Sequence, residues 1–341
     1  MGFTNFPNGI TSFGIPIYGG GGLLGLGVGN VKYLVTSRAS TNLYYEKLRT
    51  NGISGDDIFI TLQTAFDACT SGQNDVIAVT PGAHAVTAEL AWNKNNTHMI
   101  GLAGPNTASD YSEASTSIYT VTTEVGNTVN LTGNHCQFYN IGFCNAGANA
   151  ANESAMLVNG YGNYFENCSF IGNMQAQQLA DKECCSLEIY TNAHNCHWVN
   201  CQIGEDCWGA RSAADSGQLK FTGSQPNGGI MKDCTFKSYS DTATCAMVQV
   251  IGEAGSTHIG RGWFFDNCKF NNYSGASTAG TECNEVFHAE DAAAYWPLQL
   301  HNCSAFGYDE WSDTDGVVIR GTMPQANDGG GIWIALVDDE A

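Results

Sequence analysis

Four residues of one short segment could act together on a carbohydrate: Glu205, Asp206, Trp208 and Arg211. A further carboxylate, Glu188, lies in an earlier segment. Hydrolysis of a glycosidic bond needs two carboxyl groups about 5 to 9 Å apart, one as acid and one as base or nucleophile. An aromatic ring such as that of Trp208 offers an apolar face on which a sugar can stack. If the chain is an enzyme, the expected catalytic residues are Glu188, Glu205 and Asp206. The expected carbohydrate-binding residues are Trp208 and Arg211.

The same acidic residues also have a purely structural interpretation. The chain contains 33 Asp and Glu residues against 13 Lys and Arg residues, for a formal net charge of −20. Carboxylates therefore occur in most solvated loops, and two of them in one loop are weak evidence of catalysis. No phosphate-binding loop, nucleotide fingerprint or nucleophile elbow is present. We expect no catalytic residues and no cofactor, and a polysaccharide hydrolase or lyase is the alternative.

A group of cysteines and histidines in the same region raises the question of a zinc site. Structural zinc sites typically pair their cysteines as Cys-x-x-Cys, and that spacing is missing here. Cys196 and Cys201 fall at inward positions of the repeat described below. We therefore expect no metal site. The residues considered are Cys184, Cys185, His194, Cys196, His197, Cys201 and Cys207.

One repeated segment must position all of these residues. Each copy has an apolar residue two positions before an Asn or Asp, a Cys directly after it, and an apolar residue two positions further on. In the first copy, Ile141 replaces the Cys. The copies span residues 136–143, 163–170, 196–203, 229–236, 263–270 and 298–305.

The repeat predicts two short strands joined at a corner. Side chains alternate between the two faces of a strand, so Phe165 and Phe170 both point inward only if the chain turns between them. Asn167 lies at that turn, and Asn and Asp tolerate the left-handed backbone that such a corner needs. Cys168 follows at an inward position, where a free cysteine packs as a small apolar residue.

The spacing of the copies predicts a solenoid. The position after the corner recurs at intervals of 27 to 35 residues, and periods of roughly 20–50 residues are typical of solenoids. A second apolar segment lies between successive corners, for example at Leu187–Ile189 and Leu219–Phe221. Three short parallel strands per turn describe an all-β, right-handed parallel β-helix of about seven to nine turns. A leucine-rich repeat is disfavoured because its leucine spacing and helical segments are missing.

The chain divides into three parts. Residues 1–30 form an extended apolar arm, residues 31–75 a capping module with a short helix, and residues 76–341 the β-helix. The helix, which has apolar residues at helical spacing from Leu62 to Cys69, is expected to cover the open end of the solenoid. A disordered tail is the alternative for the arm, although such tails usually avoid apolar residues. The arm residues expected to bind a partner surface are Phe3, Phe6, Ile10, Phe13, Ile15, Ile17 and Tyr18.

Composition also limits the partners and the compartment. A strongly acidic surface repels nucleic acid and anionic membranes, so we expect neither as a partner. The first residues lack the basic and apolar regions of a signal peptide. Cysteines at inward positions of the repeat are expected to be free thiols, which is typical of proteins made in a reducing cytoplasm.

The chain resembles the pectate-lyase-like β-helix proteins of tailed-bacteriophage virions. The resemblance rests on a strand, an Asn-Gly loop and a short helix, followed by the motif at residues 75–84 and the segment His98–Gly104. The leader Phe6–Gly14 is similar to the start of some of these particle proteins. The resemblance covers roughly residues 1–145 by motif and the remainder by repeat architecture.

This resemblance implies a homotrimer on the virion surface, made in the host cytoplasm. The N-terminal arm would hold it to the major capsid protein or to another virion protein. The expected function is that of a capsid decoration (cement) protein or a head-surface spike, although an N-terminal anchor suits the tail equally well. Two alternatives stay open. One is a tailspike or depolymerase that binds or cleaves host polysaccharide, and the other is a receptor-binding module that binds a host glycan unchanged.

Overall fold

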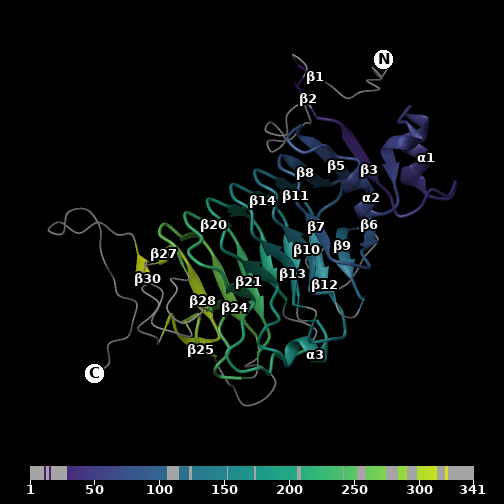
Figure 1. Ribbon diagram of the computed structural model, residues 1–341. Coiled ribbons are helices and arrows are strands. Elements are labelled where there is room, and N and C mark those ends of the chain that lie inside the picture. Colours follow the sequence, from purple (N-terminus) through teal and green to yellow (C-terminus); the bar gives the residue numbers. More distant parts are fainter. Residues whose placement is uncertain are drawn as a thin grey trace, which may run out of the picture.

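The chain coils into an elongated stack of short strands, a parallel β-helix (Figure 1). Three sheets run along the stack, and all strand pairs within them are parallel in the described residues. The all-β fold predicted from the repeat is confirmed. The computed structural model describes residues 11–12, 15–16, 29–105, 115–122, 125–151, 153–172, 174–205, 209–240, 242–251, 259–273, 283–289, 298–312 and 319–321.

A complete turn contributes one strand to each of the three sheets, and the eleven-stranded sheet extends beyond the other two. The eleven-stranded sheet contains, in spatial order, β4 (Ile58–Phe59), β3 (Val31–Leu34), β5 (Asp75–Val79), β8 (Thr97–Gly101), β11 (Gln137–Tyr139), β14 (Tyr164–Glu166), β17 (His197–Val199), β20 (Ile230–Lys232), β23 (Phe264–Asp266), β27 (Leu298–His301) and β30 (Ile319–Gly321). The eight-stranded sheet contains β6 (Gly82–Ala85), β9 (Thr116–Thr120), β12 (Gly142–Asn145), β15 (Ser169–Ile171), β18 (Gln202–Gly204), β21 (Thr235–Ser238), β24 (Lys269–Asn272) and β28 (Ser304–Phe306). The seven-stranded sheet contains β7 (Leu90–Trp92), β10 (Asn127–Leu131), β13 (Ser154–Val158), β16 (Leu187–Ile189), β19 (Leu219–Phe221), β22 (Val248–Val250) and β26 (Phe287–Ala289).

The remaining elements lie outside these sheets. The described helices are α1 (Leu43–Thr50), the 3-10 helix η1 (Gly55–Asp57), α2 (Leu62–Asp67) and α3 (Ala176–Leu179). No described helix has the length and apolar character required to span a membrane. Two small sheets pair β25 (Cys283–Glu285) with β29 (Tyr308–Glu310) in parallel, and β1 (Thr11–Ser12) with β2 (Ile15–Pro16) antiparallel.

The corners between the eleven-stranded and eight-stranded sheets have the predicted left-handed backbone. Asn140, Asn167, Asn200, Asp233, Asn267 and Asn302 have φ angles between 51° and 56°. Their side chains also bond along the stack, because Asn167 Nδ2 donates to Asn140 Oδ1 at 2.7 Å and Asn267 Nδ2 donates to Asp233 Oδ1 at 2.7 Å. Asn and Asp therefore have two roles at these corners. They tolerate the left-handed conformation, and their side chains link one turn to the next.

Two apolar columns fill the interior on either side of these corners. The ring centroid of Phe165 lies 5.0 Å from that of Phe138 and 5.3 Å from that of Trp198, and the ring planes are nearly parallel. The predicted register is confirmed in both columns. The first contains Phe138, Phe165, Trp198, Met231, Phe265 and Leu300. The second contains Phe143, Phe170, Ile203, Phe236 and Phe270, and ends at Ala305, which pairs in register but is exposed.

The cysteines that follow the corners form a third inward column of free thiols, as predicted. Cys168, Cys201, Cys234 and Cys268 are buried and Cys303 is half-buried. Each thiol lies near backbone carbonyls of its own turn and of the preceding turn. Cys201 Sγ, for example, lies 3.4 Å from Val199 O and 3.6 Å from Phe165 O. These contacts give the column a structural role.

The predicted capping helix is present as α2. It buries Leu62, Ala65 and Phe66, and the Phe66 ring lies 4.5 Å from that of Trp92 in the first turn of the solenoid. The Lys94 ammonium donates to three backbone carbonyls at the end of α2, at 2.7 to 2.9 Å. A cation at a helix C-terminus satisfies carbonyls that have no partner within the helix. The helix is thereby fixed over the open end of the core.

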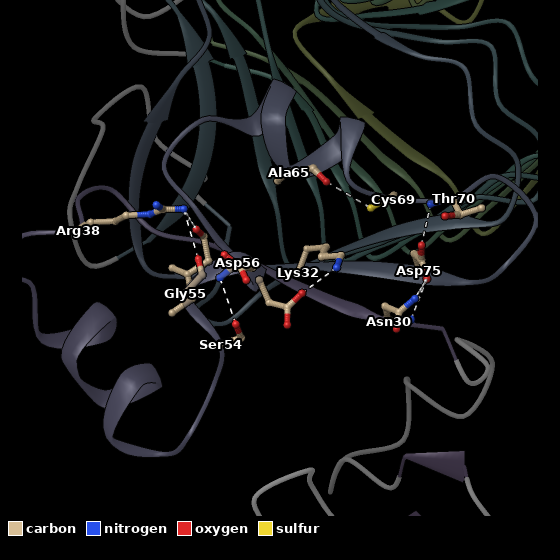
Figure 2. A network of polar contacts seen from close by, with 12 residues as sticks. Asn30, Lys32, Arg38, Ser54, Gly55, Asp56, Ala65, Cys69, Thr70 and Asp75 are labelled. Carbon is tan, nitrogen blue, oxygen red and sulfur yellow. Dashed lines mark hydrogen bonds and ion pairs between the residues drawn. The ribbon is translucent and has the colours of Figure 1, made fainter.

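A buried carboxylate marks the point where the capping module joins the solenoid. Asp75 is fully buried, and it accepts backbone hydrogen bonds from Asn30 at 2.7 Å and from Thr70 at 2.7 Å (Figure 2). Nearby, Lys32 Nζ binds Asp57 Oδ1 at 2.7 Å. Strand β3 of the capping module pairs with both β4 and β5, so the eleven-stranded sheet continues into this module.

The N-terminal part differs from the prediction in two elements. Residues 43–50, for which the sequence pattern predicts no element, form α1, a helix without a single buried residue. Residues 55–57, expected within a loop, form η1. In the arm, Ile15 is described only through the backbone pairing of β2, opposite Ser12. The other predicted arm residues lie outside the described residues: Phe3, Phe6, Ile10, Phe13, Ile17 and Tyr18.

Candidate functional site

The outward face of the seven-stranded sheet contains one of the predicted catalytic residues, Glu188. Its neighbours along the stack are Leu157 on β13 and Lys220 on β19. The next outward positions are Gln249 and His288. Because strand side chains alternate, these residues point away from the core and form a largely polar column. This column is the best candidate for a chemically active surface on the solenoid.

Lys220 is the only lysine in this column, and its ammonium group is already occupied. It donates to the backbone carbonyls of Lys182 and Glu183 at 3.0 Å each, and to Glu183 Oε2 at 3.2 Å. Its side chain is 2% exposed. An ammonium group has three donor positions, and these three contacts use all of them. Lys220 therefore fixes the loop after α3 and has no donor left for a substrate.

Two carboxyl groups near Lys220 have raised pKa values. Burial raises the pKa of Glu188, while the Thr222 hydroxyl that donates to Oε1 and the charge of Lys220 oppose the shift. Partial burial also raises the pKa of Glu153, an exposed residue, with Lys220 opposing the shift and the charge of Glu89 adding to it. A carboxyl group with a raised pKa is better suited to general-acid chemistry than an ordinary one. Sequence reasoning missed Glu153, which precedes β13 with no motif to mark it.

The other predicted residues are not brought to this column. Glu205 follows β18 of the eight-stranded sheet and is 2% exposed. Glu188 lies on the seven-stranded sheet, so the two carboxylates belong to different sheets, and their action as a paired acid and base stays a prediction. Asp206 and Trp208 lie outside the described residues.

Arg211 was expected to bind a carbohydrate, and that expectation is wrong because the residue is buried. It is 1% exposed, and its guanidinium donates to Ser216 Oγ at 3.1 Å and to the carbonyl of Cys184 at 3.0 Å. Its backbone forms a bridge to Ser240 on the next turn. Arg211 thus links neighbouring turns from inside, and sequence could not reveal this because the segment has no strand periodicity.

Cys207, one of the residues considered for zinc, lies outside the described residues. Within the described part of the chain, no group of three or more His, Cys, Asp or Glu side chains is placed to hold a metal ion. Burial raises the pKa of the Cys184 and Cys196 thiols to about 12. These thiols are therefore protonated at neutral pH when no metal is bound.

A separate pocket of about 610 Å³ lies between α1 and the start of the eight-stranded sheet. Its lining contains hydroxyl, amide and aromatic groups, and no Asp, Glu, His, Lys or Arg. This lining therefore lacks the pair of carboxyl groups that hydrolysis of a glycosidic bond needs. The lining residues are Thr36, Ser37, Thr41, Asn42, Leu43, Tyr44, Pro81, Gly82, Ala83 and Tyr119.

We expect Glu188→Gln to raise the melting temperature at pH 7 and to change it little at pH 3.5. Burial raises the pKa of Glu188, so the protonated form is favoured in the folded state. Stability from such a group is complete below the unfolded pKa, about 4.3, and is lost as the pH rises through the folded pKa. A neutral amide avoids this loss and still accepts the Thr222 hydrogen bond. Thermal unfolding at both pH values measures the difference.

The control for that experiment is Glu46→Gln on the exposed helix α1. It removes the same formal charge without relieving burial, so no gain specific to neutral pH is expected. A lower melting temperature of Glu188→Gln at pH 7 would contradict the prediction. It would mean that Lys220 and Thr222 stabilise the ionised carboxylate more than burial opposes it.

Comparison with known proteins identifies the fold and leaves the activity open. No protein-family model matches the sequence, and no curated protein sequence matches it. Among solved structures, the chain is similar to the pectate lyase Pel9A, with a TM-score of 0.57, 14% identity, and coverage of 88% of this chain and 72% of that one. It is also similar to the pectin methylesterase from carrot, with a TM-score of 0.52, 13% identity, and coverage of 90% and 87%.

A weaker similarity links the chain to a viral protein, ORF18 of Geobacillus virus E2. The TM-score is 0.42 at 12% identity, with coverage of 78% of this chain and 54% of that one, which is too low to support an inference. At identities this far below 25%, a shared β-helix says nothing about shared chemistry. The comparisons therefore establish one conclusion, that the chain has a parallel β-helix fold of the pectate lyase and pectin methylesterase type.

Proposed function

We propose that this chain is a structural protein of a bacteriophage virion, a capsid decoration or head-surface spike protein anchored by residues 1–30. The observation that supports this most is that polar side chains connect successive turns of the solenoid. In the described turns, Asn, Cys, Lys220 and Arg211 side chains bond one turn to the next. A solenoid linked in this way is a stiff rod. The phage context rests on the sequence resemblance of the leader and of residues 75–104.

The proposed mechanism is mechanical. The apolar arm binds the particle lattice or an adjoining subunit, and the rigid solenoid projects from it. Association of several chains multiplies weak arm contacts, because the second arm binds at a high effective concentration once the first is bound. In this proposal residues 1–30 extend from the capping module, which Asp75 and α2 join to the solenoid.

A second candidate function is binding or cleavage of a host cell-surface polysaccharide. The observation that favours it is the pair of carboxyls with raised pKa values, Glu153 and Glu188. The structurally similar proteins include a pectate lyase and a pectin methylesterase. This candidate predicts that the isolated protein degrades host polysaccharide, and that Glu188→Gln and Glu153→Gln each abolish the degradation without unfolding the protein.

Particle binding tests the proposal directly. Full-length protein should bind purified particles that have been stripped of this protein, over the head surface. Protein lacking residues 1–30 should bind at least tenfold more weakly, because the apolar arm contacts are gone. Sedimentation of particles with labelled protein measures both, and electron microscopy shows the location.

Two outcomes would overturn the proposal. The first is equal binding of both proteins, which would remove the arm as the anchor. The second is failure of the full-length protein to bind particles, accompanied by degradation of host polysaccharide. That second result would establish the enzyme candidate, and the two carboxyl variants would then identify its catalytic residues.

A further inference from the structure

The first strand of the eight-stranded sheet, β6, is an edge strand at the capped end of the stack (Figure 1). It pairs in parallel with β9 on one side, and no strand pairs with its other side in the described residues. Gly82 N donates to Ser115 O at 2.7 Å, toward β9. Successive residues of a strand direct their backbone groups to opposite sides. The N–H and C=O groups of Ala83 and Ala85 therefore point to the open side.

The corresponding edges of the other two sheets are protected. In the eleven-stranded sheet the edge strand is β4, and the Arg38 guanidinium donates to the carbonyl of Ile58 there. In the seven-stranded sheet it is β7, which packs against α2 through Trp92 and Phe66, with ring centroids 4.5 Å apart. Proteins protect sheet edges in these ways because an open edge pairs readily with an extended chain. Strand β6 contains no Lys, Arg, Asp or Glu, and its edge has neither kind of protection in the described residues.

The pocket of about 610 Å³ described above lies at this edge, because Gly82 and Ala83 line it. Leu43 and Tyr44 of α1 also line it, and they are 58% and 37% exposed. The volume is in the range of sites that enclose a ligand. Since the lining contains no charged residue, the pocket fits an uncharged extended segment with apolar side chains.

Residues 1–28 have this composition. They contain no Asp, Glu, Lys, Arg or His, so the rest of the chain carries the whole net charge of −20. They are attached at the same end of the stack, because Asn30 N donates to Asp75 Oδ1 at 2.7 Å. Gly29 packs so closely against Asn74 that a Cβ atom would clash with its carbonyl oxygen. An extended segment of this length spans at most about 90–100 Å, so the β6 edge is within its reach.

We infer that residues 1–28 bind the open edge of β6 in the same molecule, as an added strand in the pocket beside α1. The backbone groups of Ala83 and Ala85 then gain hydrogen-bond partners, as in other cases of β-strand addition. Apolar side chains of the segment leave water by packing against Leu43 and Tyr44. Tethering favours this segment over any other chain, because flexible linkage gives an effective concentration in the millimolar range.

The test is the amide exchange of Ala83 and Ala85, measured by NMR on protein labelled with 15N-alanine. We expect both amides to exchange at least tenfold more slowly in the full-length chain than in a chain lacking residues 1–28, because an added strand must open before they exchange. This truncation keeps Asn30 at Asp75. The amide of Ala78, in the interior strand β5, should stay protected in both chains and verifies the fold.

A point variant tests the same edge with the segment present. Ala85→Lys adds a charge at an exposed position of β6 and should speed exchange of the Ala83 amide at least tenfold. The matched control is Ala91→Lys, at an exposed position of β7, which should leave that exchange unchanged.

Equal exchange of Ala83 and Ala85 in the full-length and truncated chains would overturn the inference, whether it is fast or slow. If the truncated chain does not fold, an unchanged Ala83 exchange in Ala85→Lys would overturn it. Slow exchange that appears only as the protein concentration rises would also contradict it, because the occupant would then come from a second copy.

This inference and the proposed function fail separately. A chain that binds stripped particles through residues 1–30, but leaves the β6 edge unprotected when free, would refute strand addition and leave the structural function standing. A chain that protects β6 and never binds particles would support strand addition and refute the virion role.

Discussion

Phe165→Ala is expected to lower the free energy of unfolding by about 3–5 kcal/mol, the usual cost of truncating a buried aromatic side chain. Phe165 is fully buried. Its ring stacks on Phe138 and Trp198 and meets the edge of Phe170, with centroids 5.0, 5.3 and 5.6 Å away. The cavity would interrupt both inward columns in the middle of the stack. Denaturant unfolding monitored by tryptophan fluorescence, to which Trp198 contributes among seven tryptophans, measures the loss.

The matched control is Tyr190→Ala, which removes an aromatic ring that is 40% exposed. Surface substitutions of this kind usually change stability by less than about 0.5 kcal/mol. An unchanged denaturation midpoint for Phe165→Ala would contradict the register of the inward columns. A loss confined to the C-terminal turns would instead mean that the solenoid unfolds in parts, as repeat architectures can.

Asn167→Val is expected to lower the free energy of unfolding by about 2–4 kcal/mol. Asn167 has a φ of 52°, and the left-handed conformation costs an L residue about 1–2 kcal/mol, more when it is β-branched. The substitution also removes the hydrogen bonds from Asn167 Nδ2 to Asn140 Oδ1 and from Asn200 Nδ2 to Asn167 Oδ1. Each is worth about 0.5–1.5 kcal/mol.

Asn167→Gly separates the two causes. Glycine adopts positive φ without strain, so this variant loses the side-chain hydrogen bonds and keeps the corner. We expect it to be destabilised by about 1–2 kcal/mol, clearly less than Asn167→Val. Equal losses for the two variants would show that the corner conformation contributes nothing and that the side-chain ladder accounts for the whole effect.

The repeat made the architecture predictable from sequence because each copy requires particular residue types at fixed positions. A position that must be left-handed admits few residues other than Gly, Asn and Asp, and a ladder requires like residues at equal spacing. The corners from Asn140 to Asn302, the inward columns and the thiol column were all expected at the positions where they lie. The capping helix was predictable for the same reason, since its apolar spacing is local.

The candidate site was much less predictable. Glu205 and Arg211 are close in sequence and were predicted to lie together on the surface. The fold buries both. Their burial depends on how loops fold over the neighbouring turn, and no periodic signal reports it. Glu153 and Glu188 come near the same ammonium, that of Lys220, only because successive turns stack in register. Helix α1 was missed because it buries nothing and so leaves no apolar periodicity.

The sequence by itself determined which residues face the core and how the turns repeat, because these follow from alternation and spacing along one strand. Only the tertiary structure decided which outward residues become neighbours. Tyr164, His197, Ile230 and Phe264 lie about one turn apart in sequence, each beside different neighbours. They come together when parallel pairing brings them into a single column, at about 4.8 Å per strand.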